Sequence, residues 1–131
     1  MIGNGDARVG VVTDMGVATT LIRERLKTCD AVVVEANHDE DMLNDAERPW
    51  SLKQRIRGRQ GHLSNRHAAE MMAEIAGPRL RRICLAHLSR DCNSLEAVDR
   101  TFSDLRASST IPYSIATIAP DRPAMLTVDL A

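Results

Sequence analysis

Two short runs of β-branched residues place the strongest constraint on how this chain can fold. Residues 9–12 (Val-Gly-Val-Val) and 31–34 (Ala-Val-Val-Val) lack the polar alternation of a strand with one wet face. Between them, residues 17–27 repeat apolar side chains at helical spacing. A buried strand, a helix and a second buried strand predict a mainly parallel sheet flanked by helices. We therefore expect an α/β fold in which the run at residues 31–34 is covered on both faces.

The rest of the chain continues this alternation. Short helices are predicted at residues 41–45 and 51–57, and a clearer helix, capped by Ser64 or Asn65, runs to residue 75. A strand at residues 80–86 precedes a helix that begins at a capping-box pattern of Asn93 and Glu96. Residues 114–118 and 125–128 predict two final strands. Because no repeat or linker divides the 131 residues, we expect a single domain.

Charge and cysteine content exclude several classes of protein. The chain has 17 Lys and Arg against 18 Asp and Glu, so no overall field attracts it to nucleic acid or to a membrane. Its three cysteines form no C-x-x-C pair, which argues against a disulfide framework and a thiolate zinc site. No apolar run could span a bilayer, and no secretory signal is visible. We therefore expect a cytoplasmic protein that does not contact membranes.

Ionisable residues follow three of the predicted strands. Asp14 comes just after residues 9–12, Glu35 directly after residues 31–34 and His87 directly after residues 83–86. The carboxyl ends of parallel strands meet at one edge of the sheet, where ligands bind, so these side chains should converge there. Carboxylates beside a neutral imidazole suit a metal such as zinc or manganese. The alternative is that each residue only solvates the end of its own strand.

Four motifs occur in an order that resembles a known family. They are V-T-D-M-G at residues 12–16, E-A-N-H-D at 35–39, G-H-L-S-N at 61–65 and L-A-H-L-S-R at 85–90. In this order they resemble the second half of a metallo-β-lactamase-fold hydrolase. The segment at residues 35–43, followed by P-W and L-K-Q-R-I, is most similar to the bacterial YycJ-like or VicX-like branch. The resemblance implies half of an αββα sandwich and a phosphodiesterase or exonuclease that acts on nucleic acid.

The resemblance also implies roles for single residues. Asp14 matches the aspartate that bridges two metal ions, and His87 matches the last metal-ligand histidine. His62 resembles the histidine that protonates the leaving oxygen in tRNA-processing members, and Glu35 resembles the acidic residue that holds it. These catalytic and metal roles are chemically consistent, since a histidine oriented by a carboxylate can donate a proton near neutral pH.

Two further polar residues lie within the quoted motifs. His38 and Asn65 are candidates for contacts with the residues that surround the metal. For His38, a contact with substrate and a loop position without a role remain as alternatives.

One large departure from the family limits what this chain can do alone. The metal motif H-x-H-x-D-H, which belongs to the first half of the fold, does not occur in residues 1–131. We therefore interpret the chain as the C-terminal half of the fold, a truncated reading frame or a fragment. The complete fold would hold two divalent ions, zinc or manganese. With Asp14 and His87 alone, we expect weak or partial metal binding and little activity.

A cluster of basic residues offers a local patch for nucleic acid. Lys53, Arg55, Arg57 and Arg59 occur within seven positions without an acidic residue among them. Such a cluster beside the site would contact phosphates, although a solvated helix surface is the alternative.

Two functions remain open. The first is the family's metal-dependent hydrolase, represented here by its second half. The second is a non-catalytic α/β module that pairs with a partner or with itself. A half-sandwich would expose apolar surface, so either the missing N-terminal half or a second copy is the expected partner.

Overall fold

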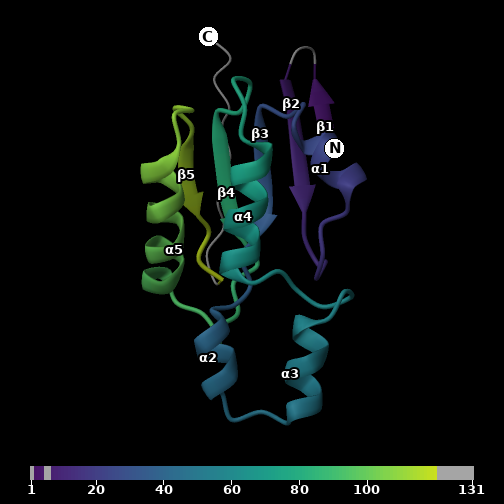
Figure 1. The fold of residues 1–131 in the computed structure, drawn as a ribbon, viewed down its shortest axis with the longest axis vertical. Helices are drawn as coiled ribbons and strands as arrows, with labels where there is room; N and C mark the ends of the chain where they lie inside the picture. Colours follow the sequence, from purple (N-terminus) through teal and green to yellow (C-terminus); the bar gives the residue numbers. More distant parts are fainter. Residues whose placement is uncertain (1, 5–6, 121–131) are drawn as a thin grey trace.

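The computed structural model describes residues 2–4 and 7–120, and its centre is a five-stranded sheet (Figure 1). Strand β1 pairs antiparallel with β2, whereas β2, β3, β4 and β5 are all parallel. This confirms the predicted sheet, although β1 was not predicted, and the strand expected at residues 125–128 lies outside the described residues. In sheet order the strands are Ile2–Asn4, Ala7–Val12, Ala31–Glu35, Arg82–Ala86 and Ser114–Thr117.

In the described part of the chain five helices connect the strands, and two of them begin later than the sequence pattern predicts. Helix α1 begins at Thr20 rather than at residue 17, because Thr19 caps it by accepting a hydrogen bond from the Ile22 N–H. Helix α5 is capped by Ser94 and not by Asn93. Ser64 caps α4, as expected. The helices are α1 Thr20–Leu26, α2 Glu40–Asp45, α3 Trp50–Arg57, α4 Asn65–Ile75 and α5 Leu95–Ser108.

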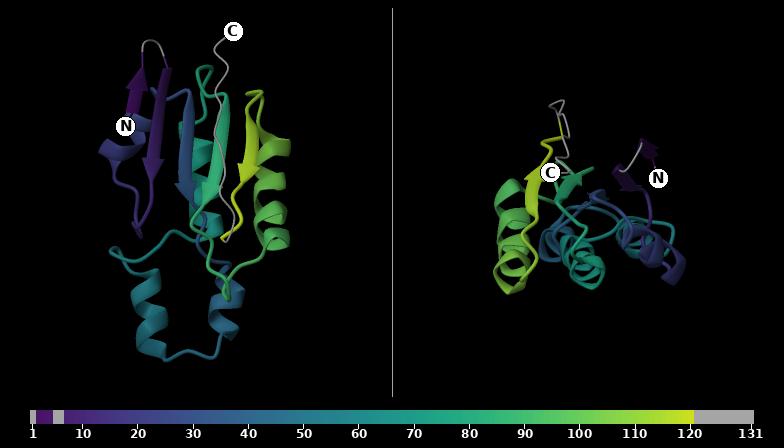
Figure 2. Two further views of the ribbon diagram at one scale, coloured as in Figure 1. Left: turned by 180° about the vertical axis from the view of Figure 1, so that it is seen from behind. Right: turned by 90° about the horizontal axis from the view of Figure 1, so that it is seen from above.

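The hydrophobic core lies on one face of the sheet. Helices α1, α4 and α5 all cover this face, as the view from above shows (Figure 2). Val34 and Leu85 point into the core from the strands, and Met72 and Phe102 meet them from α4 and α5. None of the described helices is long and apolar enough to cross a membrane.

The opposite face of the sheet carries a row of small apolar side chains. Val11, Val33, Cys84 and Ala116 are consecutive partners in the register of β2 to β5. Val11 is 52% exposed, and within the described residues no helix packs on this row. The expectation that residues 31–34 are covered on both faces is confirmed, because Ala31, Val32 and Val34 are buried and Val33 is half-buried. The face that carries the row is open mainly at Val11, since Cys84 is buried as well.

Helices α2 and α3 extend past the carboxyl ends of the strands (Figure 1). The end of α3 is tied to the loop that follows β2, because the Gly16 N–H donates to the Arg59 carbonyl at 3.1 Å. A Cβ atom on Gly16 would lie 1.7 Å from the Gly58 carbonyl oxygen, so only glycine permits this approach. The contact brings two loops together at the edge of the sheet where polar residues were predicted to meet.

A buried pair of amides joins the starts of α4 and α5. Asn65 and Asn93 each donate from Nδ2 to the other's Oδ1 at 2.9 Å. Asn93 also donates to the Ala36 carbonyl, directly after β3, and accepts from the Ser94 N–H. Its whole hydrogen-bonding capacity is used in the interior, which explains why Asn93 does not cap α5.

We expect Asn93→Ala to lower the free energy of unfolding by about 2–3 kcal/mol, because the Asn65 amide and the Ala36 carbonyl would be left buried and unpaired. Urea unfolding followed by circular dichroism measures this loss. The exposed Asn44 provides a control, and Asn44→Ala should stay within about 0.5 kcal/mol of the wild type. The Asn65→Ala/Asn93→Ala pair should cost less than the sum of the single losses, and strict additivity would contradict the coupling.

Candidate metal centre

Four ionisable side chains meet at the carboxyl edge of the sheet. Asp14, Glu35, His62 and His87 each offer one possible ligand atom, and these atoms all lie within 4.8 Å of one another. They come from the ends of β2, β3 and β4 and from the loop that precedes α4. The structure thus brings together the residues that the strand ends and the family motifs singled out. The alternative, in which each residue separately solvates its own strand, does not describe this arrangement.

The Glu35 carboxylate lies at the centre of this cluster and is completely buried. Its Oε1 accepts hydrogen bonds from Nδ1 of His62 at 2.6 Å and from Nδ1 of His87 at 2.7 Å. Its Oε2 accepts a hydrogen bond from the Asp14 N–H at 3.1 Å. The predicted contact between Glu35 and His62 is present, and the contact with His87 is an addition that sequence reasoning missed. Because Nδ1 of each ring is engaged, Nε2 remains for a metal ion or a proton.

The Asp14 carboxylate lies on the solvent side of the cluster. Its Oδ1 is 3.5 Å from Nδ1 of His87 and 3.8 Å from Nδ1 of His62, and its side chain is 67% exposed. The predicted proximity of Asp14 and His87 is therefore present. Two carboxylates and two imidazoles are donors that zinc and manganese accept, so the residues present fit a divalent ion. Exposure of Asp14 leaves the cluster open to an ion from solution.

The backbone is strained at two members of this cluster. Asp14 has a φ of 56° and His87 a φ of 60°, and no other non-glycine residue in the described part of the chain has a positive φ. Each is held by a hydrogen bond: the Asp14 N–H binds Glu35, and the His87 carbonyl accepts from Nδ2 of Asn37 at 3.0 Å. Strain that the surroundings maintain is typical of functional sites. Asn37 lies within the E-A-N-H-D motif, but no sequence signal assigned it this role.

His62 is placed by a tight turn at Gly61. A Cβ atom on Gly61 would lie 2.2 Å from the Ile56 carbonyl oxygen, and the His62 N–H donates to the same carbonyl at 2.9 Å. Only glycine leaves room for this turn, because a side chain would collide with that carbonyl. Helix α4 begins immediately afterwards, so His62 is fixed on both sides.

His38 and Asn65 lie outside the cluster. Asn65 is committed to Asn93, as described above. His38 is buried, and its Nδ1 lies 3.2 Å from Oδ1 of Asn37. Burial is the main reason that the pKa of His38 falls to about 4, and Glu40 offsets part of this effect. At neutral pH the ring is therefore uncharged. Asn37 links it indirectly to the cluster, since the same side chain holds the His87 carbonyl.

The four basic residues predicted to contact phosphate do not behave alike. Lys53 is buried, and its Nζ donates to the Asn44 carbonyl at 2.6 Å, so it is not placed to meet a ligand. A long aliphatic stem allows lysine to be buried when its ammonium finds an acceptor. Arg55 and Arg59 are exposed. The guanidinium of Arg57 lies 5.6 Å from the ring centroid of Trp50 and faces a cavity shared with His38.

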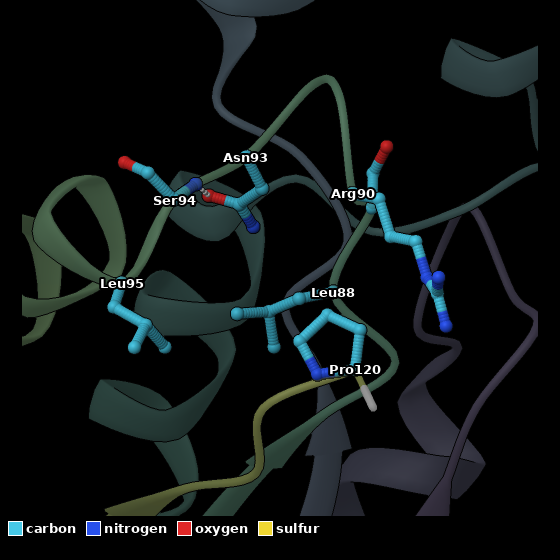
Figure 3. A pocket seen from close by; sticks show the side chains of 7 residues that line it. Leu88, Arg90, Asn93, Ser94, Leu95 and Pro120 are labelled. Atoms are coloured by element: carbon cyan, nitrogen blue, oxygen red, sulfur yellow. Dashed lines mark hydrogen bonds between the residues drawn. The ribbon is translucent and has the colours of Figure 1, made fainter. Parts of the chain in front are cut away.

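A separate cavity of about 270 Å³ lies beyond the loop that follows β4. Figure 3 shows Leu88 between Leu95 and Pro120, with Asn93 and Ser94 along another side. The nearby Arg90 extends away from these apolar side chains. The cavity has mainly apolar walls and contains none of the four cluster residues.

We expect the stability of the fold to decrease in acid because of His38. The pKa of this group is lowered in the folded chain, so between about pH 6.5 and pH 4 the unfolded chain binds more protons. The free energy of unfolding should fall as pH drops through this window, by about 2 kcal/mol from His38 at about pH 5. Urea unfolding at about pH 7 and pH 5 measures this. His38→Gln should lose that share of the pH dependence, and an unchanged dependence would contradict the assignment.

Comparison with known proteins finds relatives in sequence and a neighbour in fold. No family model matches the chain. It is 35% identical over 102 residues to "Exodeoxyribonuclease YycJ" of Bacillus anthracis, covering 78% of this chain and 39% of that protein. It is 32% identical over 121 residues to "Exodeoxyribonuclease WalJ" of Streptococcus pneumoniae, covering 89% of this chain and 45% of that protein. The chain therefore spans less than half the length of these curated relatives.

A solved structure supports the fold. The chain resembles "Crystal Structure of a New Diphosphatase from the PhnP Family" with a TM-score of 0.50 and 13% identity, covering 97% of this chain and 38% of that one. At this identity the likeness concerns the fold alone, and it matches the α/β arrangement of four parallel strands with helices. Over most of its length, the chain is homologous to the YycJ and WalJ exodeoxyribonucleases of metallo-β-lactamase fold.

Proposed function

We propose that this chain carries part of the active site of a metal-dependent phosphodiesterase that acts on DNA. The observation that carries the proposal is the buried Glu35 carboxylate, which orients two imidazoles beside the exposed Asp14. The exodeoxyribonuclease names of the relatives support DNA as the substrate. Zinc or manganese suits the donors, and the cytoplasm suits a protein with free cysteines.

In this proposal each of the four cluster residues, Asp14, Glu35, His62 and His87, has a distinct role. Asp14 and His87 would hold divalent metal ions, and the chemistry that such ions would supply is to polarise a phosphate and to lower the pKa of water. His62 gives a proton to the leaving oxygen. Glu35 fixes Nδ1 of His62, so the transferred proton is the one on Nε2, and the adjacent carboxylate stabilises the protonated ring before transfer. Asn37 positions His87 by holding its carbonyl.

The site needs residues beyond those described here. A catalytic zinc usually takes three protein ligands, and a site for two ions needs more than Asp14 and His87 supply. Glu35 follows Val33 by two residues in β3, so the cluster borders the open face of the sheet. A polypeptide that covers the row of Val11, Val33, Cys84 and Ala116 would reach the metal ions. We infer that the missing N-terminal half of the fold fills this place.

The open row also favours a second candidate, a module that binds a partner or a second copy without catalysis. Val11 at 52% exposed is the main observation for it. The two candidates differ in their dependence on Asp14. Partner binding through the apolar row alone does not require this carboxylate, whereas metal-dependent hydrolysis does.

We expect the isolated chain to bind Zn²⁺ or Mn²⁺ weakly and to hydrolyse little DNA, because too few ligands hold the ions. Adding the N-terminal half of a relative should raise both. Calorimetric metal titration and release of nucleotides from DNA measure the change. Asp14→Ala should abolish the gain, whereas Asp45→Ala, which removes an exposed carboxylate in α2, should not. Tight binding and Asp14-dependent turnover by the isolated chain would overturn the expectation.

In the assembled protein, Glu35→Gln should weaken metal binding by about 10- to 100-fold, because the contact that orients His87 loses its charge. The alkaline limb of the pH–rate profile should also move to lower pH, since the proton donor His62 loses the carboxylate that stabilises its protonated form. Steady-state kinetics across pH, with calorimetry on the same samples, separates the two effects. If neither metal affinity nor the pH profile changes, Glu35 does not position these rings.

A further inference from the structure

A second cavity borders the candidate metal centre on the side of α3 and α4. It measures about 230 Å³, and its walls include His38, Arg57, His62 and His67. His62 belongs both to this cavity and to the cluster around Glu35, so the two adjoin at its imidazole ring. A ligand held at the metal centre would therefore have this cavity beside it.

The electrostatics of this cavity favour an anion. One carboxylate, that of Glu40, faces it, and that carboxylate already accepts hydrogen bonds from Ser64 Oγ at 3.1 Å and Arg66 Nε at 3.0 Å. Partial burial alone would raise the pKa of Glu40, but these hydrogen bonds from Arg66 and Ser64 outweigh it and hold the pKa low. Arg66 is paired with Glu70 as well. The negative charge of Glu40 is therefore already engaged by Arg66, which it shares with Glu70.

Arg57 is left as the uncompensated cation. Within residues 2–4 and 7–120 its guanidinium forms no ion pair, and its described contact is with the Trp50 ring. The first turn of α4 carries no acidic residue and presents the positive end of the helix dipole to the same space. An arginine, imidazole side chains and a helix N-terminus are together suited to a phosphate group.

We propose that this cavity binds a second phosphate of the DNA strand, next to the phosphate that is cleaved. This inference rests on the proposed function, because it makes His62 the boundary between two phosphates of one strand. Arg57 supplies the charge and hydrogen-bond donors, and Nδ1 of His67 supplies a further donor when its Nε2 accepts from Nη2 of Arg66 at 3.3 Å. Without its ions the metal centre could not bind a phosphate, because the carboxylates of Asp14 and Glu35 would repel it.

Inorganic phosphate tests the cavity without metal or hydrolysis. In the presence of a chelator, phosphate added to the full 131-residue chain should shift the NMR ring signals of His38 and His67, and shift those of His87 less. His38→Gln and His67→Gln assign these signals. Arg57→Gln should weaken phosphate binding about tenfold, whereas Arg55→Gln, an exposed position in the same helix, should change it less than about twofold. Equal effects of the two arginine variants would overturn the proposal.

DNA oligonucleotides identify which phosphate is bound. Binding of a short single strand should lose about one unit of its log–log salt dependence in Arg57→Gln but not in Arg55→Gln. A preference for a strand with a 5′- or 3′-phosphate over the unphosphorylated strand would indicate a terminal phosphate, and equal affinities would indicate an internal one. If Arg57→Gln leaves the salt dependence unchanged, the cavity binds neither a terminal nor an internal phosphate, and the proposal is wrong.

The Asp14→Ala variant separates the test of the phosphate site from the test of the proposed phosphodiesterase function. Asp14→Ala should leave phosphate affinity within about twofold, because the cavity does not use the metal ligands. Loss of hydrolysis in Asp14→Ala with retained phosphate binding supports both proposals. If the assembled protein binds phosphate but shows no Asp14-dependent hydrolysis, the proposed phosphodiesterase function is wrong and the proposed phosphate site is retained.

Discussion

The arrangement of this molecule depends on one buried carboxylate. Burying an ionised group is costly unless hydrogen bonds replace its water, and among the described residues the ion pairs of Glu35 are with His62 and His87, not with an arginine or lysine. Three separate loops supply the missing donors: the Asp14 N–H, Nδ1 of His62 and Nδ1 of His87. Because each donor follows a different element, satisfying Glu35 fixes the relative position of three loops. The same contacts that stabilise the carboxylate therefore assemble the candidate site.

A second set of polar contacts keeps those loops in place. Asn37 holds the His87 carbonyl, and the Asn65–Asn93 pair joins the starts of two helices to the chain after β3. The left-handed backbone at His87 carries a strain of about 1–3 kcal/mol, which its surroundings must offset. The hydrogen bond from Asn37 to the His87 carbonyl is one contact that does so. A site held in this way is organised before any ion or substrate arrives, which reduces the reorganisation that catalysis would require.

The sequence was sufficient to predict the parts of the site that follow from strand ends. Apolar runs located β2, β3 and β4, and the edge rule for parallel sheets placed Asp14, Glu35 and His87 together. The second hydrogen bond of Glu35, to His87, depends on side-chain direction, which strand periodicity does not specify. Asn93 was misjudged because capping propensity is local, whereas its partner Asn65 is distant in sequence. Lys53 was misjudged because charge alone does not reveal a nearby carbonyl that can accept its ammonium.

The open face and the incomplete metal site have a common physical origin in the proposed half-sandwich. Val33 and Glu35 project from the same face of β3, so the apolar row and the buried carboxylate are neighbours. A partner that covers the row gains hydrophobic burial and also brings its own ligands to the ions. Ion binding and association are then linked, and each strengthens the other by the same factor. Such linkage explains how a small row of valine, cysteine and alanine could suffice for a stable contact, since the metal ions contribute the remaining free energy.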